Sequence, residues 1–108
     1  MNNINQCKVE NRYDENENPT GGSVEGVGLR IDWQDGPLGR DGERKAPNGA
    51  FVETVLSAAK QRLEFYNEGK FRCRENSLAI TKIEEALHWL EHRTKERESR
   101  KVEGEHKV

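Results

Sequence analysis

Three arginines near the C-terminal end of the chain have the spacing of a phosphate-binding site. Arg93, Arg97 and Arg100 follow at intervals of four and three residues, which places their guanidinium groups on one face of a helix. A guanidinium stays charged at any working pH and can donate two parallel hydrogen bonds to one phosphate. Taken alone, the residues favour a plainer interpretation, in which these arginines pair with Glu96 and Glu98 on a solvated helix surface.

Aromatic side chains could supply the other part of a nucleotide site, because a base stacked on a ring gains about 1–3 kcal/mol. The candidates are Trp33, Phe65, Tyr66, Phe71 and Trp89. Tyr66 and Trp89 continue the apolar stripes of two expected helices and are therefore predicted to pack in a core. Phe65 lies beside its stripe and is freer to contact a ligand.

Patterns for catalysis or metal binding are weak in this sequence. His88 and His92 are four residues apart, but two ligands are too few for a metal site. Glu84 and Glu85 are adjacent on a helix and diverge, which makes them a poor acid and base pair. We therefore predict no enzyme, no metal and no cofactor.

The composition indicates a single small domain with a thin core. Of the 108 residues, 31% are hydrophobic and 35% are charged, so a half-exposed apolar stripe is expected to be buried against a second copy. The net charge of −2 argues against DNA or RNA as a partner. No apolar stretch is long enough to span a membrane, no signal peptide is evident, and Cys7 and Cys73 are expected to be reduced thiols.

An α+β fold is predicted, with short N-terminal antiparallel strands followed by an antiparallel two-helix hairpin that oligomerises through its helices. Residues 1–22 are read as a flexible lead-in, with an edge strand around Cys7–Tyr13 as an alternative. Residues 23–48 are expected to form a strand and loop region, because Leu29, Ile31 and Trp33 alternate with polar residues. Turns are expected at 35–37, where Gly36 can take positive φ, and at 41–42.

The helical hairpin is expected over 49–108, tail included. In the first helix, at about 49–67, the apolar positions with helical spacing are Val52, Val55, Leu56, Ala59, Leu63 and Tyr66. Asn48 is its expected N-cap, and Gly69 is expected to take the left-handed conformation after its end.

In the second helix the apolar stripe comprises Ala79, Ile80, Ile83, Ala86, Leu87, Trp89 and Leu90. Asn76 or Ser77 is its expected cap, and good helix formers are expected to continue the helix to about Arg100. Gly104 is expected to end it.

These motifs, taken in order, resemble a known family. The stretch IDWQDGPLG, the helix NGAFVETVLSAAKQRLEFY, the helix CRENSLAITKIEEALHWLEHRTKER and the ending VEGEHKV resemble the phage Thoeris anti-defence proteins of the first type. Those proteins share a helical hairpin with the second type of phage anti-CBASS protein. The likeness covers about residues 28–108, and the loop stretch 33–37 is its part most typical of the Thoeris branch.

The resemblance implies a sponge that works in the cytoplasm of the infected bacterium. Such a protein binds the glycocyclic ADP-ribose signal of Thoeris without cleaving it, and some hexameric relatives also hold cyclic dinucleotides and trinucleotides of CBASS. Carried over to this sequence, the ligand-binding positions are Arg93, Arg97, Asn76, Phe65 or Tyr66, Trp33 and Gln34. A homo-oligomer is implied, at least a dimer, or a hexamer as in some relatives.

Two other functions compete with this interpretation. One is an enzyme that cleaves the cyclic nucleotide, with Glu84 or a histidine assisting water. The other is a charged helical module that binds a host protein, for which Arg93 and Arg97 would have no small molecule to contact.

Overall fold

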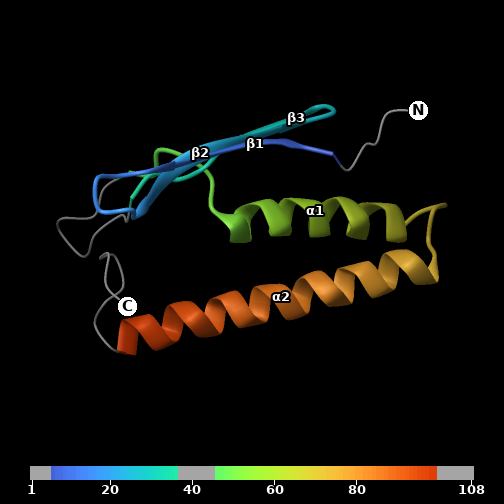
Figure 1. Ribbon diagram of the computed structural model, residues 1–108. Coiled ribbons are helices and arrows are strands. Elements are labelled where there is room, and N and C mark those ends of the chain that lie inside the picture. The colour runs from blue at the N-terminus through green and yellow to red at the C-terminus, as the bar shows by residue number, and fades with distance from the viewer. Residues whose placement is uncertain (1–5, 37–45, 100–108) are drawn as a thin grey trace. The chain divides into compact units, whose positions relative to one another are not determined.

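The computed structural model describes residues 6–36 and 46–99 (Figure 1). Within that part, the chain forms two compact units that meet in sequence between Phe51 and Val52. The first unit carries the strands β1, Lys8–Tyr13, β2, Pro19–Gly26, and β3, Leu29–Asp32. The second carries the helices α1, Val52–Asn67, and α2, Arg74–Ser99. This order of elements confirms the predicted α+β fold of N-terminal antiparallel strands followed by two helices.

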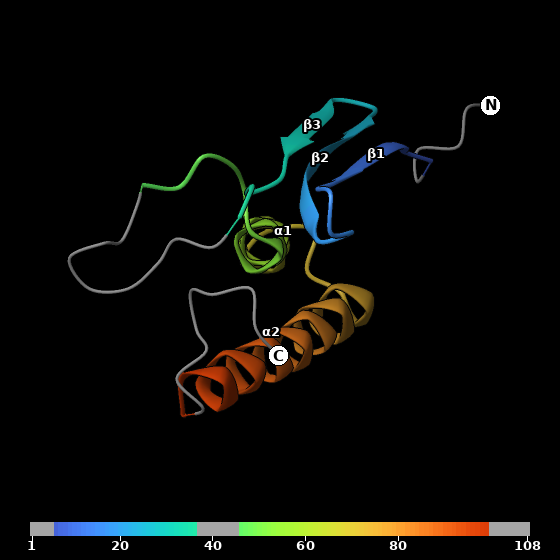
Figure 2. The ribbon, with the colours of Figure 1, turned by 60° about the vertical axis from the view of Figure 1, so that its left-hand side comes forward.

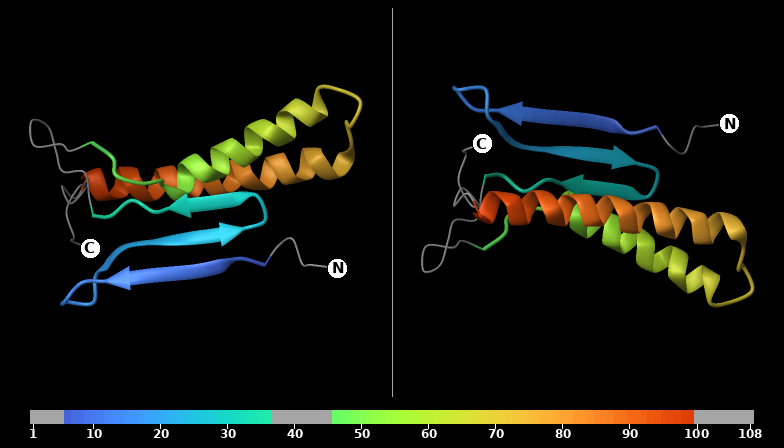
Figure 3. Two further views of the ribbon diagram at one scale, coloured as in Figure 1. Left: turned by 90° about the horizontal axis from the view of Figure 1, so that it is seen from above. Right: turned by 90° about the horizontal axis from the view of Figure 1, so that it is seen from below.

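The three strands form an antiparallel sheet in the order β1-β2-β3 (Figures 2 and 3). In its register, Val9 is opposite Val24, and Val24 is opposite Ile31. The β1–β2 connection is held by Asp14, whose Oδ1 accepts backbone hydrogen bonds from Asn16 at 2.8 Å and Asn18 at 2.9 Å. The acidic and asparagine-rich run therefore forms the tight turn that its composition favours.

Strands β1 and β2 begin within residues 1–22, where the sequence predicted a flexible lead-in. The edge strand considered as an alternative is present as β1. A strand ladder is held by backbone hydrogen bonds, so it forms here without the apolar alternation that sequence reasoning requires. The boundary placed at residue 22 lies inside β2.

The two faces of the sheet differ sharply in polarity. One face gathers charged side chains: Lys8, Glu10, Arg12, Glu25, Arg30 and Asp32. Arg12 pairs with Glu10 at 2.9 Å, and Arg30 pairs with Asp32 at 3.0 Å and also with Glu25. The opposite face carries the apolar side chains of β1, β2 and β3, as the alternation of β3 predicted.

Helices α1 and α2 form an antiparallel hairpin (Figure 1). Three contacts mark its register. Asn67 Nδ2 donates to Ser77 Oγ at 2.9 Å, Lys60 Nζ lies 3.5 Å from Glu84 Oε2, and Arg93 Nη2 lies 3.8 Å from Glu53 Oε2. The residues that α1 contributes are seven apart, which puts them on one face.

The helix ends differ from their predictions. Asn48 does not cap α1, because its amide instead accepts from Asp35 N at 2.8 Å and donates to Asp35 O at 3.2 Å. Helix α2 begins before Asn76 and Ser77, and Cys73 occupies its N-cap, with Sγ accepting from Asn76 N at 3.4 Å. Gly69 has no positive φ, unlike Gly36 at 78°. The expected turn at 41–42, Arg100 and Gly104 lie outside the described residues.

No hydrophobic side chain in the described ranges is buried. The stripe of α2 is half-buried from Ala79 to Leu90, whereas Trp89, predicted to pack with it, is 67% exposed. Trp89 lies outside the stripe because, with 3.6 residues per turn, it projects from a different side of α2 than Leu87 and Leu90, which are half-buried. Cys7 and Cys73 are not joined by a disulfide. Neither described helix is long and apolar enough to cross a membrane.

Candidate functional site

Aromatic rings gather where α1 ends and the connection to α2 begins. The rings of Phe65 and Tyr66 have centroids 5.9 Å apart at 55°, and those of Tyr66 and Phe71 are 6.2 Å apart at 82°. Phe65 is 61% exposed and Phe71 is 71% exposed, while Tyr66 is half-buried. Phe65 is thus the more available of the two adjacent aromatics, as its position beside the stripe predicted.

A cation belongs to this aromatic group. The Arg62 guanidinium lies 5.0 Å from the centroid of Phe65 and 4.8 Å from that of Tyr66, and its Nε donates to Tyr66 Oη at 3.1 Å. Sequence reasoning missed Arg62. The signal was present, because Arg62 precedes Phe65 and Tyr66 by three and four residues, the spacing at which helical side chains meet.

A shallow hollow of about 310 Å³ opens beside these rings. Its lining comprises Phe65, Tyr66, Glu68, Gly69, Lys70 and Phe71. Aromatic rings, with Lys70 in the lining and Arg62 over the rings of Phe65 and Tyr66, suit a ligand that combines a flat ring system with negative charge.

Asn76 joins this end of the hairpin. Its Nδ2 donates to the Phe71 carbonyl at 3.1 Å, which fixes the side chain against the connection. Asn67 braces the same connection, since its Oδ1 accepts from Cys73 N at 3.1 Å. The structure therefore brings together Phe65, Tyr66 and Asn76. We name this region the turn end.

The arginines lie at the opposite end of the hairpin, the arginine end. Arg93 is 56% exposed, and it pairs with Glu53 in the first turn of α1, at 3.8 Å. A contact of that length between exposed groups holds the guanidinium weakly. Arg97 lies within α2, and its side chain is outside the described residues.

One chain does not bring the two ends together. Asn76 and Arg93 both belong to α2, and their separation in sequence corresponds to about 25 Å along the helix axis. The base and the phosphates of one nucleotide are joined through a single ribose and lie much closer than that. The predicted residues thus fall into two groups, one at each end of a single hairpin.

Trp33 and Gln34 belong to the other unit. Trp33 bridges to Ala50, and the close approach excludes a Cβ at position 49, where the chain has Gly49. The Gln34 Oε1 accepts from Asn48 N at 2.9 Å and Gly49 N at 3.2 Å, and its Nε2 donates to Asp35 O and Gly36 O. The amide groups of Gln34 are fully used in holding the two ends of this loop together.

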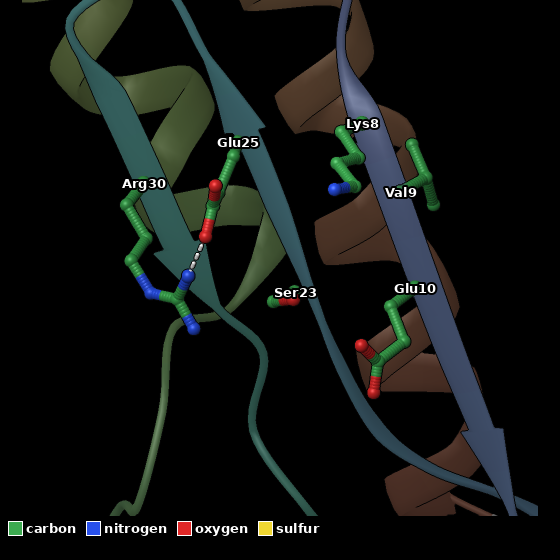
Figure 4. A pocket seen from close by; sticks show the side chains of 6 residues that line it. All are labelled: Lys8, Val9, Glu10, Ser23, Glu25 and Arg30. Atoms are coloured by element: carbon green, nitrogen blue, oxygen red, sulfur yellow. Dashed lines mark hydrogen bonds and ion pairs between the residues drawn. The ribbon is translucent and has the colours of Figure 1, made fainter.

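A second hollow, of about 330 Å³, lies on the charged face of the sheet (Figure 4). Lys8, Val9, Glu10, Ser23, Glu25 and Arg30 line it. Figure 4 shows Arg30 directed at Glu25 on the neighbouring strand. Because its main cation is already paired with carboxylates, this hollow is a weaker candidate for an anionic ligand than the turn end.

Comparisons with known proteins give a consistent result. The family model of the Acb2/Tad1 hairpin domain matches residues 25–95, which include β3, α1 and most of α2. The chain is 45% identical over 76 residues to Thoeris anti-defense 1 of Bacillus phage SBSphiJ7. That alignment covers 70% of this chain and 51% of the relative, so the chain spans about half the length of the curated relative that it matches.

Proposed function

The chain belongs to the Acb2/Tad1 hairpin-domain family, and on that premise we propose that it is a phage anti-defence protein that sequesters a cyclic nucleotide. In this proposal it binds glycocyclic ADP-ribose, the Thoeris signal, and releases it unchanged, so that the effector is never activated. Its place of action is the cytoplasm of the infected bacterium. The name of the phage relative supports the proposal. So does the chemistry of the turn end and the arginine end, which we treat as two half-sites of one ligand site.

The observation that carries it is the aromatic and cationic hollow at the turn end. Adenine can stack on Phe65, the exposed ring beside the hollow, and Asn76 offers an amide at the same end. Arg93 and Arg97 are proposed to hold the pyrophosphate, because two guanidinium groups one turn apart suit two linked phosphates. These contacts bind and orient a nucleotide, and none requires a nucleophile.

The separation of the half-sites leads to a second part of the proposal: the complete site is made by two copies. A two-fold axis that sets two hairpins side by side in opposite directions brings the arginine end of one copy to the turn end of the other. It does so twice, which gives two equivalent sites. The lack of a buried hydrophobic side chain in the described residues agrees with further burial between copies.

We propose that Trp33 and Gln34 have different roles in ligand binding. Because the Gln34 amide is occupied by backbone groups of residues 35–36 and 48–49, we assign it the role of positioning the loop. Trp33, which is half-buried, is proposed to contact the ligand directly. Cyclic dinucleotides and trinucleotides of CBASS are proposed as further ligands of a larger assembly, up to a hexamer.

Release of the bound ligand tests the proposal. The protein is incubated with glycocyclic ADP-ribose, freed of unbound material and heated, and the released compound is identified by mass spectrometry. Intact compound in near-stoichiometric amount is expected, with loss of retention in the Arg93→Ala/Arg97→Ala variant. A cleaved product would establish an enzyme instead. No retained compound would overturn this ligand and direct the test to cyclic oligonucleotides.

A further inference from the structure

The outer edge of strand β1 is a surface that the proposed function does not use. Strand β1 lies at the end of the sheet order, and in the described chain it pairs only with β2. All six of its residues are exposed. An edge strand presents unpaired backbone groups to any second strand that fits it.

Along a β-strand, successive residues direct their backbone N–H and C=O groups alternately to one side and to the other. This alternation identifies which backbone groups of β1 face outward. The Gly22 carbonyl accepts from Trp33 N at 2.9 Å, so Gly22 faces β3 and its neighbours in β2 face β1. The register places Ser23 opposite Glu10. Glu10, and with it Lys8 and Arg12, therefore turn their backbone groups toward β2. The backbone groups of Val9 and Asn11 therefore point away from the sheet. The register shifts between Arg12 and Tyr13, but Asp14 N donates to Asn18 O at 3.0 Å, so Tyr13 also faces outward.

The alternation of backbone groups and the charges of β1 together select one antiparallel register in which β1 can pair with β1 of a second copy. Antiparallel pairing about a two-fold axis must set outward-facing residues opposite one another, so the axis passes through a residue. The axis can pass through Glu10 or through Asn11. In each of these two cases five residues of one β1 pair with five residues of the other. An axis at Glu10 sets Glu10 against Glu10 and Lys8 against Arg12, which are like charges.

An axis at Asn11 gives complementary pairs throughout. Glu10 of each copy is opposite Arg12 of the other, in the pairs without hydrogen bonds, where side chains approach most closely. Val9 is opposite Tyr13 on the apolar face, and Asn11 is opposite its own copy. Each outward-facing residue exchanges both of its backbone hydrogen bonds. The charges that commonly protect an edge strand from association here favour a single register.

From this self-complementarity we propose that the outer edge of β1 binds β1 of a second copy, in an antiparallel register centred on Asn11, to form a continuous six-stranded sheet. The partner is thus another copy of this chain. The contact is separate from the helix-mediated pairing of the proposed function, and neither depends on the other. A chain with both contacts has two isologous surfaces and can build assemblies larger than a dimer.

Disulfide capture in the full chain provides the test. In the proposed register the Cα atoms of the two Asn11 residues are about 5.5 Å apart, within disulfide reach. Asn11→Cys in a Cys7→Ser background is expected to form a disulfide between the two introduced thiols under mild oxidation, identified as a linked peptide by mass spectrometry. Val9→Cys in the same background is the matched control. It lies on the same face, but its copies are about 14 Å apart along the strand, so it is expected not to link.

Charge reversal then tests the register. Glu10→Arg sets like charges opposite each other at two places, and so does Arg12→Glu. Added to the Asn11→Cys chain, each is expected to reduce formation of the intersubunit disulfide about tenfold or more. An equimolar mixture of the two variants is expected to restore it, as linked heterodimers, because each chain then carries the complement of the other. This recovery also shows that the variant chains are folded.

Three results would overturn the proposal. The first is linking of Val9→Cys in place of Asn11→Cys, which would indicate a different register. The second is an Asn11→Cys disulfide that charge reversal leaves unchanged or that mixing does not restore. The third is a disulfide between the introduced thiol and Cys73 as the main product, because it would show that another segment covers this edge.

Discussion

The two ends of the helical hairpin carry different chemistry and are held together differently. The turn end has three aromatic rings, a cation stacked on two of them, and side-chain hydrogen bonds of 2.9–3.1 Å from Asn67. At the arginine end the Arg93 guanidinium is exposed, and its ion pair with Glu53 across the two helices is 3.8 Å long. The turn end is braced and suited to a base, whereas the arginine end is loosely held and suited to phosphates. The aromatic hollow and the closely spaced arginines of α2 thus lie at different ends, which is why we propose that the complete site combines two copies.

The largest expected effect comes from the arginine end. Replacing Arg97 with alanine removes charge-assisted hydrogen bonds to phosphate and is expected to weaken binding of glycocyclic ADP-ribose by about 1.5–3 kcal/mol, with the fold unchanged. Calorimetric titration measures the affinity and circular dichroism the fold. Lys95→Ala is the matched control, because Lys95 is a nearby cation paired with Glu91 at 3.2 Å. Unfolding of Arg97→Ala, or equal loss in the control, would count against the assignment.

At the turn end, Phe65→Ala is expected to weaken the same binding by about 1–3 kcal/mol, since the base loses its stacking surface. Trp89→Ala is its control, because Trp89 is as exposed as Phe65 but does not line the hollow. Titration of both variants separates loss of a specific stack from loss of exposed aromatic surface. Should Tyr66→Ala weaken binding more than Phe65→Ala does, with the chain still folded, Tyr66 would replace Phe65 as the stacking residue.

Because side-chain contacts hold the turn end more firmly than the arginine end, substitutions at the two ends are expected to lower the free energy of unfolding by different amounts. Asn67→Ala removes the hydrogen bonds to Cys73 N and Ser77 Oγ and is expected to lower the free energy of unfolding by about 1–3 kcal/mol, because a half-buried N–H loses its acceptor. Urea unfolding followed by circular dichroism measures the change. An unchanged midpoint would mean that these bonds do not hold the turn end.

The smallest effect is expected for Glu53→Gln at the arginine end. Its ion pair with Arg93 is long and exposed, so the free energy of unfolding is expected to change by less than about 1 kcal/mol. Freed from this partner, Arg93 is expected to bind the ligand no less tightly. The same unfolding and titration experiments apply. A loss of stability as large as that of Asn67→Ala would contradict the contrast between the two ends.

Much of the fold could be predicted from the sequence, because its signals are local. The apolar spacing of α1 and α2 and the alternation of β3 placed these elements within a few residues. Strand β1 was only an alternative, since its pairing depends on backbone groups and on a turn built by Asp14. Asn48 was assigned to a cap because sequence reasoning had no access to its distant partner Asp35.

The candidate site residues could be named from the sequence, but their arrangement could not. Residue chemistry singled out Arg93 and Phe65, and the resemblance added Asn76, yet only the antiparallel hairpin shows that the arginine and the aromatic lie at opposite ends. Gln34 was assigned to the ligand on resemblance alone, and its amide is occupied by the loop backbone. Arg62 belongs to no motif, and only its spacing to Phe65 and Tyr66 indicates the contact that the structure shows.

Subunit complementation tests the central claim most directly. An Arg93→Ala/Arg97→Ala chain and a Phe65→Ala/Asn76→Ala chain, carrying different tags, are produced together, and the mixed assemblies are isolated through both tags. Alone, each variant is expected to lose binding of glycocyclic ADP-ribose. The mixed dimer is expected to regain one intact site per two chains, at the affinity of the unmodified protein, and to release the compound unchanged. Mixed assemblies that still fail to bind, although both chains are folded, would contradict a site shared between copies.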